Sequence, residues 1–406
     1  MRLSSNIIKI RNENNWLLYN TITQELIAID DLENPSKEEK KYLIDNGYIT
    51  MNDDVDYIDY KTFLDHIRYS EEIIEFIIHT NYSCNLNCSY CYQSDIKSNL
   101  KMGDETIINL VNYINNIIID KNPREVGLCF IGGEPLLEWN TITKIINSIK
   151  APTSTYISKS IITNGILLND LIVNELINYD FKMIQITLDG YKDNHNLFRT
   201  NIKNEGSYDI IMSQLKKYSK KIPIVLNINL NSKNINDVKK IFSDIRKNDI
   251  KITPIFSEIF DSENNHFEDK ISLESNSWYE AHKIALDYGY RFEPFYRNNY
   301  FACGLYRDNE YIISPDGKVY KCISGIGKNN YFVGDLKDVN SYKYLQNRSS
   351  FVEDFKLNDR CKSCEYKSIC SITCKYRHPK MDICYKKNIY INDIELIKEQ
   401  YRRDNE

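Results

Sequence analysis

The chain has 406 residues, more than one ordinary domain and enough for two or three. Its hydrophobic content of 42% supports a sizeable core, and its net charge of −5 gives no basic footprint for nucleic acid. No run of about 18 apolar residues occurs and the start, MRLSSNIIKI, lacks an apolar signal region, so we expect a cytoplasmic protein without a membrane span. In such a chain, eleven cysteines favour metal binding or catalysis over disulfides.

Residues 1–72 predict a small N-terminal module. Its β candidates, separated by Asn-rich turns, are Ile7–Ile10, Trp16–Tyr19 and Glu25–Ile29. Ser36 is a suitable N-cap for a following helix, and a second helix is expected at Tyr60–Tyr69. Three strands with two helices predict a winged-helix-like unit, and a plain cap on the next domain is the alternative.

Residues 73–260 alternate between strand and helix patterns. The expected strands are Ile73–Ile78, Val126–Ile131, Ser158–Ile162, Met183–Leu188, Pro223–Leu230 and Lys251–Phe256. The expected helices between them are Glu105–Ile119, Trp139–Ile149, Asp170–Ile177, Tyr208–Tyr218 and Ile235–Arg246. Strands separated by helices predict a parallel sheet, and six repeats predict an α/β fold of the partial (β/α)6, TIM-like barrel type.

Unusual residues follow the first four of these strands. The sets are Cys84, Cys88 and Cys91 (C-x3-C-x2-C), then Gly132-Gly133-Glu134-Pro135, Thr163-Asn164-Gly165 and Leu188-Asp189-Gly190. In such folds chemistry collects at the carboxyl ends of the strands, so four sets at one edge predict a single site. Three thiolates on one loop would bind a cubic iron–sulfur cluster and leave one iron open to a ligand that is not protein.

These residues closely resemble the radical S-adenosylmethionine (SAM) enzymes over about residues 74–256. The resemblance implies that Cys84, Cys88 and Cys91 bind a [4Fe-4S] cluster whose open iron chelates SAM. Reductive cleavage then gives a 5′-deoxyadenosyl radical that abstracts hydrogen from the substrate. It further implies SAM contacts from Tyr90, Gly132, Gly133, Glu134, Pro135, Thr187 and Arg199. A surface arginine at Arg199 and a plain turn at Asp189-Gly190 are the alternatives.

The sequence names no catalytic residue beyond this site. Cys129, within the second strand, is predicted to be a buried core cysteine.

A Cys-rich C-terminal region at 301–406 follows a linking region at 261–300. Asp316-Gly317 predicts a hairpin between Tyr311–Ile313 and Lys318–Tyr320. The cysteine order resembles the SPASM domain, which carries auxiliary iron–sulfur clusters, and a zinc site is the alternative. The resemblance assigns one auxiliary cluster to Cys361, Cys364, Cys370 and Cys384, and another to Cys303, Cys322 and Cys374. The second set has no fourth cysteine, so its fourth iron is either open or bound by another kind of ligand.

The combined resemblance implies three [4Fe-4S] clusters and a maturase that forms a thioether or C–C cross-link in a ribosomally synthesised precursor peptide. Its partners would be that peptide and a reductant such as flavodoxin or ferredoxin. The N-terminal module resembles elements that recognise peptides in such enzymes. An anaerobic sulfatase-maturing enzyme is the alternative, although such enzymes usually carry Asp where Ile323 follows Cys322. A non-enzymatic Cys-rich metal or redox protein explains only the C-terminal region.

Overall fold

A computed structural model describes residues 2–50, 53–259, 266–271, 276–292, 303–353, 364–369 and 386–406, with Asp261, Lys362 and Tyr376. The chain forms two units. The first comprises Met1–Ser70, Phe292–Asp308 and Phe351–Glu406, and the second comprises Glu71–Arg291 and Asn309–Ser350. No helix in the described ranges combines the length and apolar character that a bilayer crossing requires.

The first unit contains the expected small module. Strands β2 (Ile7–Arg11), β3 (Trp16–Asn20) and β4 (Leu26–Ile29) form an antiparallel sheet in chain order. The other elements of this unit are β1 (Arg2–Leu3), α1 (Lys37–Asp45), β5 (Ile49–Thr50), α2 (Asp53–Tyr69) and α11 (Lys386–Asn405). The three strands and Ser36 as N-cap are confirmed, and Ser36 and Glu39 form a reciprocal capping box. The winged-helix-like assignment stays a prediction.

A small hydrophobic core holds this module together. Leu18, Leu43 and Tyr48 are fully buried and pack with Ile7 and Ile29. The sheet and α1 therefore share one apolar layer, because neither can bury its apolar face alone.

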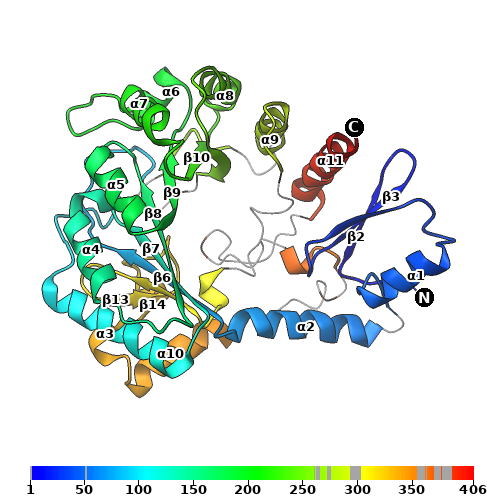
Figure 1. Ribbon diagram of the computed structural model, residues 1–406, viewed down its shortest axis with the longest axis horizontal. Coiled ribbons are helices and arrows are strands. Elements are labelled where there is room, and N and C mark those ends of the chain that lie inside the picture. The colour runs from blue at the N-terminus through cyan, green and yellow to red at the C-terminus, as the bar shows by residue number, and fades with distance from the viewer. Residues whose placement is uncertain are drawn as a thin grey trace. The chain divides into compact units, whose positions relative to one another are not determined.

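The second unit is built on one sheet, which has nine strands in the described residues (Figure 1). Its order is β11-β10-β9-β8-β7-β6-β12-β13-β14. The strands are β6 (Ile73–His79), β7 (Glu125–Ile131), β8 (Tyr156–Thr163), β9 (Phe181–Thr187), β10 (Ile224–Leu230), β11 (Thr253–Glu258), β12 (Glu310–Ile313), β13 (Lys318–Tyr320) and β14 (Phe332–Asp335). The six strands from β6 to β11 are parallel and lie in chain order, which confirms the predicted parallel sheet.

Helices connect the parallel strands. Those between the strands β6 to β11 are α3 (Asp104–Lys121), α4 (Trp139–Ser148), α5 (Asp170–Asn178), α6 (Lys192–Phe198), α7 (Tyr208–Tyr218) and α8 (Val238–Lys247). Helix α9 (Ser277–Asp287) follows β11, and α10 (Tyr342–Glu353) follows β14. The predicted helices are confirmed, with boundaries that differ by up to three residues. Helix α6 was missed, because it is short and its sequence, KDNHNLF, lacks an apolar stripe. Helix α9 was also missed, since it lies within residues 261–300, which were expected to form a linking region.

Alternation along β6 explains how the sheet is covered. Ile74, Phe76 and Ile78 are fully buried, whereas Ile73, Glu75 and Ile77 on the other face are half-buried. Phe76 contacts Tyr113 of α3 edge-on with ring centroids 6.2 Å apart, and it stacks on Tyr311 at 5.1 Å. The first face therefore packs under the helices, and the other face forms the partly open inner side of the sheet.

The hairpin predicted at Asp316-Gly317 is confirmed, since β12 and β13 are antiparallel. The sequence did not indicate its second role. Strand β12 pairs in parallel with β6, with Glu310 opposite Glu75 and Ile313 opposite Ile78, so the hairpin extends the sheet. Ile312, Tyr320 and Ile326 form an apolar cluster with Tyr82, which lies two residues before Cys84. Residues 309–350 thus support the cysteine loop from one side.

Candidate active site

The cysteine loop begins where β6 ends and is held by main-chain contacts with residues 132–134. Gly133 N donates to Asn81 O at 3.1 Å, and Glu134 N donates to Ser83 O at 2.8 Å. A Cβ on Gly133 would lie 2.2 Å from Ser83 O, and one on Gly132 would lie 2.6 Å from Asn81 Oδ1. The glycines are therefore required by the approach of two chain segments, a reason that differs from the expected approach to a ligand.

Glu134 joins the ends of β7 and β8. Its fully buried carboxylate accepts from Thr163 Oγ1 at 2.6 Å, Asn164 N at 2.8 Å and Leu136 N at 3.0 Å. Burial raises the pKa of Glu134, and these donors act in the opposite direction. The sets at residues 132–135 and 163–165, which the sequence placed at one edge, are thus physically connected.

The three thiols have a shared electrostatic environment. Cys84, Cys88 and Cys91 are half-buried, and Asn164 Nδ2 lies 3.8 Å from Cys84 Sγ. Burial raises the pKa of Cys88 to about 11, and a negative charge on Cys91 or Cys84 would raise it further. The Arg199 cation acts on Cys88 in the opposite direction. The structure places Arg199 against the cysteine loop, because Ser89 N donates to Phe198 O at 3.1 Å and Asn87 N donates to Thr200 O at 2.7 Å.

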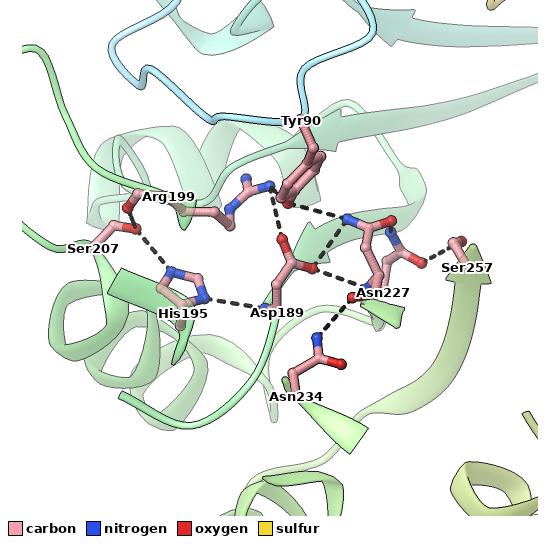
Figure 2. Close-up of polar contacts among 9 residues, drawn as sticks. Tyr90, Asp189, His195, Arg199, Ser207, Asn227, Asn234 and Ser257 are labelled. Carbon is pink, nitrogen blue, oxygen red and sulfur yellow. Dashed lines mark hydrogen bonds and ion pairs between the residues drawn. The ribbon is translucent and has the colours of Figure 1, made fainter. Parts of the chain in front are cut away.

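A second set of side chains gathers at the ends of β9 and β10 (Figure 2). Arg199 Nη1 donates to Tyr90 Oη at 2.7 Å and to Asp189 Oδ2 at 3.3 Å. Asp189 Oδ1 accepts from the Asn229 main-chain N–H at 2.9 Å and from Asn229 Nδ2 at 3.0 Å. Asp189 is fully buried, and Arg199 is 7% exposed. Asp189 is therefore the counter-ion of Arg199, and the alternatives of a plain turn and a surface arginine are wrong.

Glycine at 190 follows from this packing. Gly190 has φ +114°, and a Cβ there would lie 3.0 Å from Asn234 Cβ and 3.1 Å from Asn194 Cβ. Asp237 accepts from Tyr191 N at 3.0 Å and from Asn194 Nδ2 at 2.6 Å, which fixes the start of α6. The turn therefore sets the direction in which α6 leaves the sheet.

The sequence prediction missed His195, Ser207, Asn227 and Asn229. Asn227 Nδ2 donates to Asn229 Oδ1 at 3.1 Å, and Ser257 Oγ donates to Asn227 Oδ1 at 2.7 Å. A signal for the two asparagines exists, because LNINL within β10 places them at alternate positions of an apolar strand where Asn is disfavoured. His195 and Ser207 gave no such signal.

The remaining predicted residues are distributed as follows. Thr187 is buried at the end of β9, and Pro135 is buried at the start of a short 3-10 helix. Cys129 lies on the inner face of β7, where its thiol is half-buried and hydrogen-bonded to Ser160. Cys303 and Cys364 are half-buried in the first unit and Cys322 in the second. Cys361, Cys370, Cys374 and Cys384 lie outside the described residues.

The donor set of the loop fits an iron–sulfur cluster. Among the residues that the structure describes, no three His, Cys, Asp or Glu side chains already sit together as a ready-made metal site. Three cysteines on one loop beside the buried Arg199 nevertheless supply the kind of ligand set that an iron–sulfur cluster takes. The loop therefore has the right ligand chemistry at the carboxyl edge of the sheet.

Comparison with known proteins gives the same result. Residues 77–245 match the Radical SAM superfamily. Radical SAM cyclopropyl synthase TigE of Paramaledivibacter caminithermalis is 32% identical over 140 residues, 31% of this chain and only 29% of that protein. A cysteine-type anaerobic sulfatase-maturating enzyme of Clostridium novyi is 24% identical over 324 residues, 72% of this chain and 85% of that enzyme.

Solved structures share the fold. The enzyme anSMEcpe, with bound AdoMet and the Kp18Cys peptide, has a TM-score of 0.64 at 20% identity over 82% of this chain and 98% of that one. SuiB of Streptococcus suis has a TM-score of 0.55 at 14% identity over 92% of this chain and 95% of that one. The chain thus carries a radical SAM domain at residues 77–245 and is an enzyme of the radical SAM superfamily.

Proposed function

We propose that the protein modifies a ribosomally synthesised peptide by radical SAM chemistry, forming a thioether or C–C cross-link. In this proposal Cys84, Cys88 and Cys91 bind a [4Fe-4S] cluster, which supplies one-electron cleavage of SAM to a 5′-deoxyadenosyl radical. The observation that carries the proposal is the three-thiol loop beside buried Arg199 at the carboxyl edge of the parallel sheet.

The chain's own residues have separable roles in this proposal. Glu134 and the main chain of Gly133 fix the cysteine loop against β7 and β8. Both side-chain hydrogen bonds described for the Arg199 guanidinium start at Nη1, and its buried Nε has no partner among the described residues, so donors remain for the SAM carboxylate. Tyr90, which Arg199 holds by its hydroxyl, presents its ring for the adenine. Thr187 and Pro135 complete the same edge.

Auxiliary clusters and a peptide-binding N-terminal module belong to the same proposal. Cys303, Cys322 and Cys374 would bind one cluster, and Cys361, Cys364, Cys370 and Cys384 the other. The antiparallel sheet β2-β3-β4 would bind the leader peptide along an edge strand. Support for a peptide substrate comes from the structural relatives, because anSMEcpe was solved with a peptide and SuiB with precursor peptide SuiA.

The direct test uses anaerobically reconstituted full-length protein. We expect iron and sulfide contents corresponding to three [4Fe-4S] clusters, and reductive release of 5′-deoxyadenosine from SAM. A variant with Cys84, Cys88 and Cys91 all replaced by Ala should retain the auxiliary iron but release no 5′-deoxyadenosine. Release by this variant would refute the proposed cluster site, and zinc in place of the auxiliary iron would refute the SPASM assignment.

Formylglycine formation in a sulfatase is the second candidate. It is favoured by the long match to the Clostridium novyi enzyme, which covers 85% of that protein. Cys-containing peptides incubated with the enzyme distinguish the two. A cross-link removes two hydrogens from the peptide, keeps its sulfur and leaves no aldehyde, whereas formylglycine formation removes the sulfur of the Cys residue and gives an aldehyde that reacts with hydrazides. An aldehyde product would establish the second candidate and exclude the first.

A further inference from the structure

His195 is the group that connects the two members of the buried ion pair (Figure 2). Its Nδ1 lies 3.1 Å from the main-chain N of Asp189, and its Nε2 lies 2.8 Å from Ser207 Oγ. Ser207 Oγ in turn lies 2.9 Å from the carbonyl oxygen of Arg199. One imidazole therefore links the main chain of Asp189 to the main chain of Arg199.

The hydrogen-bond pattern assigns the protonation state of this ring. The Asp189 N–H can only donate, so Nδ1 must accept and carries no proton. The ring proton is therefore on Nε2, which donates to Ser207 Oγ, and the Ser207 hydroxyl donates to Arg199 O. The three hydrogen bonds that run from Asp189 N–H through His195 and Ser207 to Arg199 C=O therefore all point in the same direction.

Burial supports the same assignment. His195 is fully buried, and Ser207 is 1% exposed. Burial together with the nearby Arg199 cation lowers the pKa of His195 well below its ordinary value, so the ring is neutral. Tyr208 covers it edge-on at 5.8 Å between ring centroids.

Arg199 needs such an anchor. It is the residue after α6 ends, with its N–H bonded to His195 O at 2.9 Å, and its side chain is long. Tyr90 and Asp189 hold the guanidinium, while Ser207 holds the main chain from which the side chain extends. Fixing both ends of an arginine reduces the conformational entropy that it would lose on binding a ligand.

We propose that His195 and Ser207 are positioning residues that hold Arg199 ready to bind the carboxylate of SAM. The proposal rests on the role given to Arg199 under Proposed function. His195 and Ser207 contact neither cofactor nor substrate and act only by fixing Asp189 and Arg199. They should therefore set the affinity for SAM and leave the rate of its cleavage at saturation nearly unchanged.

The experiment measures SAM dissociation constants and 5′-deoxyadenosine release for the reconstituted holoenzyme. Ser207→Ala removes two hydrogen bonds, those to His195 Nε2 and to Arg199 O, and His195→Phe removes two, those to Asp189 N and to Ser207 Oγ, while retaining an aromatic ring. We expect Ser207→Ala, which releases the main chain of Arg199, to raise the SAM dissociation constant about tenfold, the factor given by one net hydrogen bond. We expect His195→Phe, which leaves the buried N–H of Asp189 without an acceptor, to raise it further. The release rate at saturating SAM should stay within about twofold, since a uniform binding loss alters KM and not kcat.

Two further variants separate the possible failures. Leu215→Ala removes a fully buried side chain of α7, the helix that follows Ser207, and should lower stability while leaving SAM affinity unchanged. Arg199→Lys keeps the charge but removes the planar fork, and it should weaken SAM binding.

If Arg199→Lys weakens SAM binding while Ser207→Ala and His195→Phe do not, the positioning proposal is overturned. If Arg199→Lys also leaves affinity unchanged, the role of Arg199 itself is wrong. An equal loss of SAM affinity in Leu215→Ala would show that His195 and Ser207 act only by stabilising the fold.

Discussion

At the ends of β6 and β7 the candidate site is held by main-chain contacts, whereas at the ends of β9 and β10 it is held by side chains. On the first half, Gly133 N and Glu134 N bond to carbonyl oxygens of residues 81 and 83. On the second half, Asp189, Arg199 and Asn229 form a buried network. One edge of the sheet is therefore fixed by close main-chain packing on one side and by a buried ion pair on the other.

The largest effect is expected on the side-chain half. Asp189→Asn leaves the buried Arg199 cation without its counter-charge, and removing one partner of a buried pair costs about 3–5 kcal/mol of unfolding free energy. Chemical denaturation under anaerobic conditions measures this loss. Lys217→Gln, which removes an exposed ion pair with Asp170, should give no measurable change. Similar losses in the two variants would show that charge does not fix this half.

The main-chain half should be destabilised by added side-chain volume at its glycines. Gly133→Ala forces a Cβ against Ser83 O and should lower the unfolding free energy by about 1–3 kcal/mol and displace the cysteine loop. Gly127→Ala is the matched control, because its Cβ would meet Glu75 Cγ and Ser158 Oγ at 3.5 Å, an ordinary contact. Stability and 5′-deoxyadenosine release are the measurements, and full activity in Gly133→Ala would contradict the steric explanation.

His79, at the end of β6, gives the main-chain half a pH dependence. It is fully buried with both ring nitrogens unpartnered in the described structure, and burial lowers its pKa to about 3. Between its ordinary pKa and that value, the unfolded chain binds a proton that the folded chain does not. Stability should therefore fall with falling pH, by about 1.4 kcal/mol per pH unit from this group.

The variant His79→Phe tests this dependence, because phenylalanine keeps a ring but does not titrate. Between about pH 6 and pH 4.5, the unfolding free energy of this variant should fall less steeply with falling pH than that of the unmodified protein. His195 has a lowered pKa for similar reasons and contributes in the same direction, so part of the slope should remain. An unchanged pH dependence of the unfolding free energy would show that burial does not lower the pKa of His79.

The smallest effect is expected at the outer end of the side-chain network. Ser257→Ala removes the hydrogen bond to Asn227 Oδ1 and should cost about 1 kcal/mol. SAM affinity should stay close to that of the unmodified protein, because the side chain of Asn227 is linked to the Asp189 carboxylate through Asn229 and not directly in the described hydrogen bonds. A large loss of affinity would extend the second half of the site as far as β11.

Local sequence patterns determined the six parallel strands, five of the connecting helices and the hairpin at Asp316-Gly317. They also placed the cysteine loop and residues 132–135, 163–165 and 188–190 at one edge. These features can be predicted from the sequence because each depends on residues that are neighbours along the chain. Apolar periodicity sets strands and helices, glycine marks close main-chain approach, and ligand spacing within a loop is a local property.

Only the tertiary structure decided how distant residues contact one another within the site. It pairs Arg199 with Tyr90 and Asp189, and it adds Ser207 and Asn229, which were not predicted as site residues. The pairing of β12 with β6 is likewise a long-range choice, made by burying Ile312 and Tyr320 against Tyr82. The physical reason is that burial and charge pairing depend on distance in space, which the order of residues along the chain does not specify.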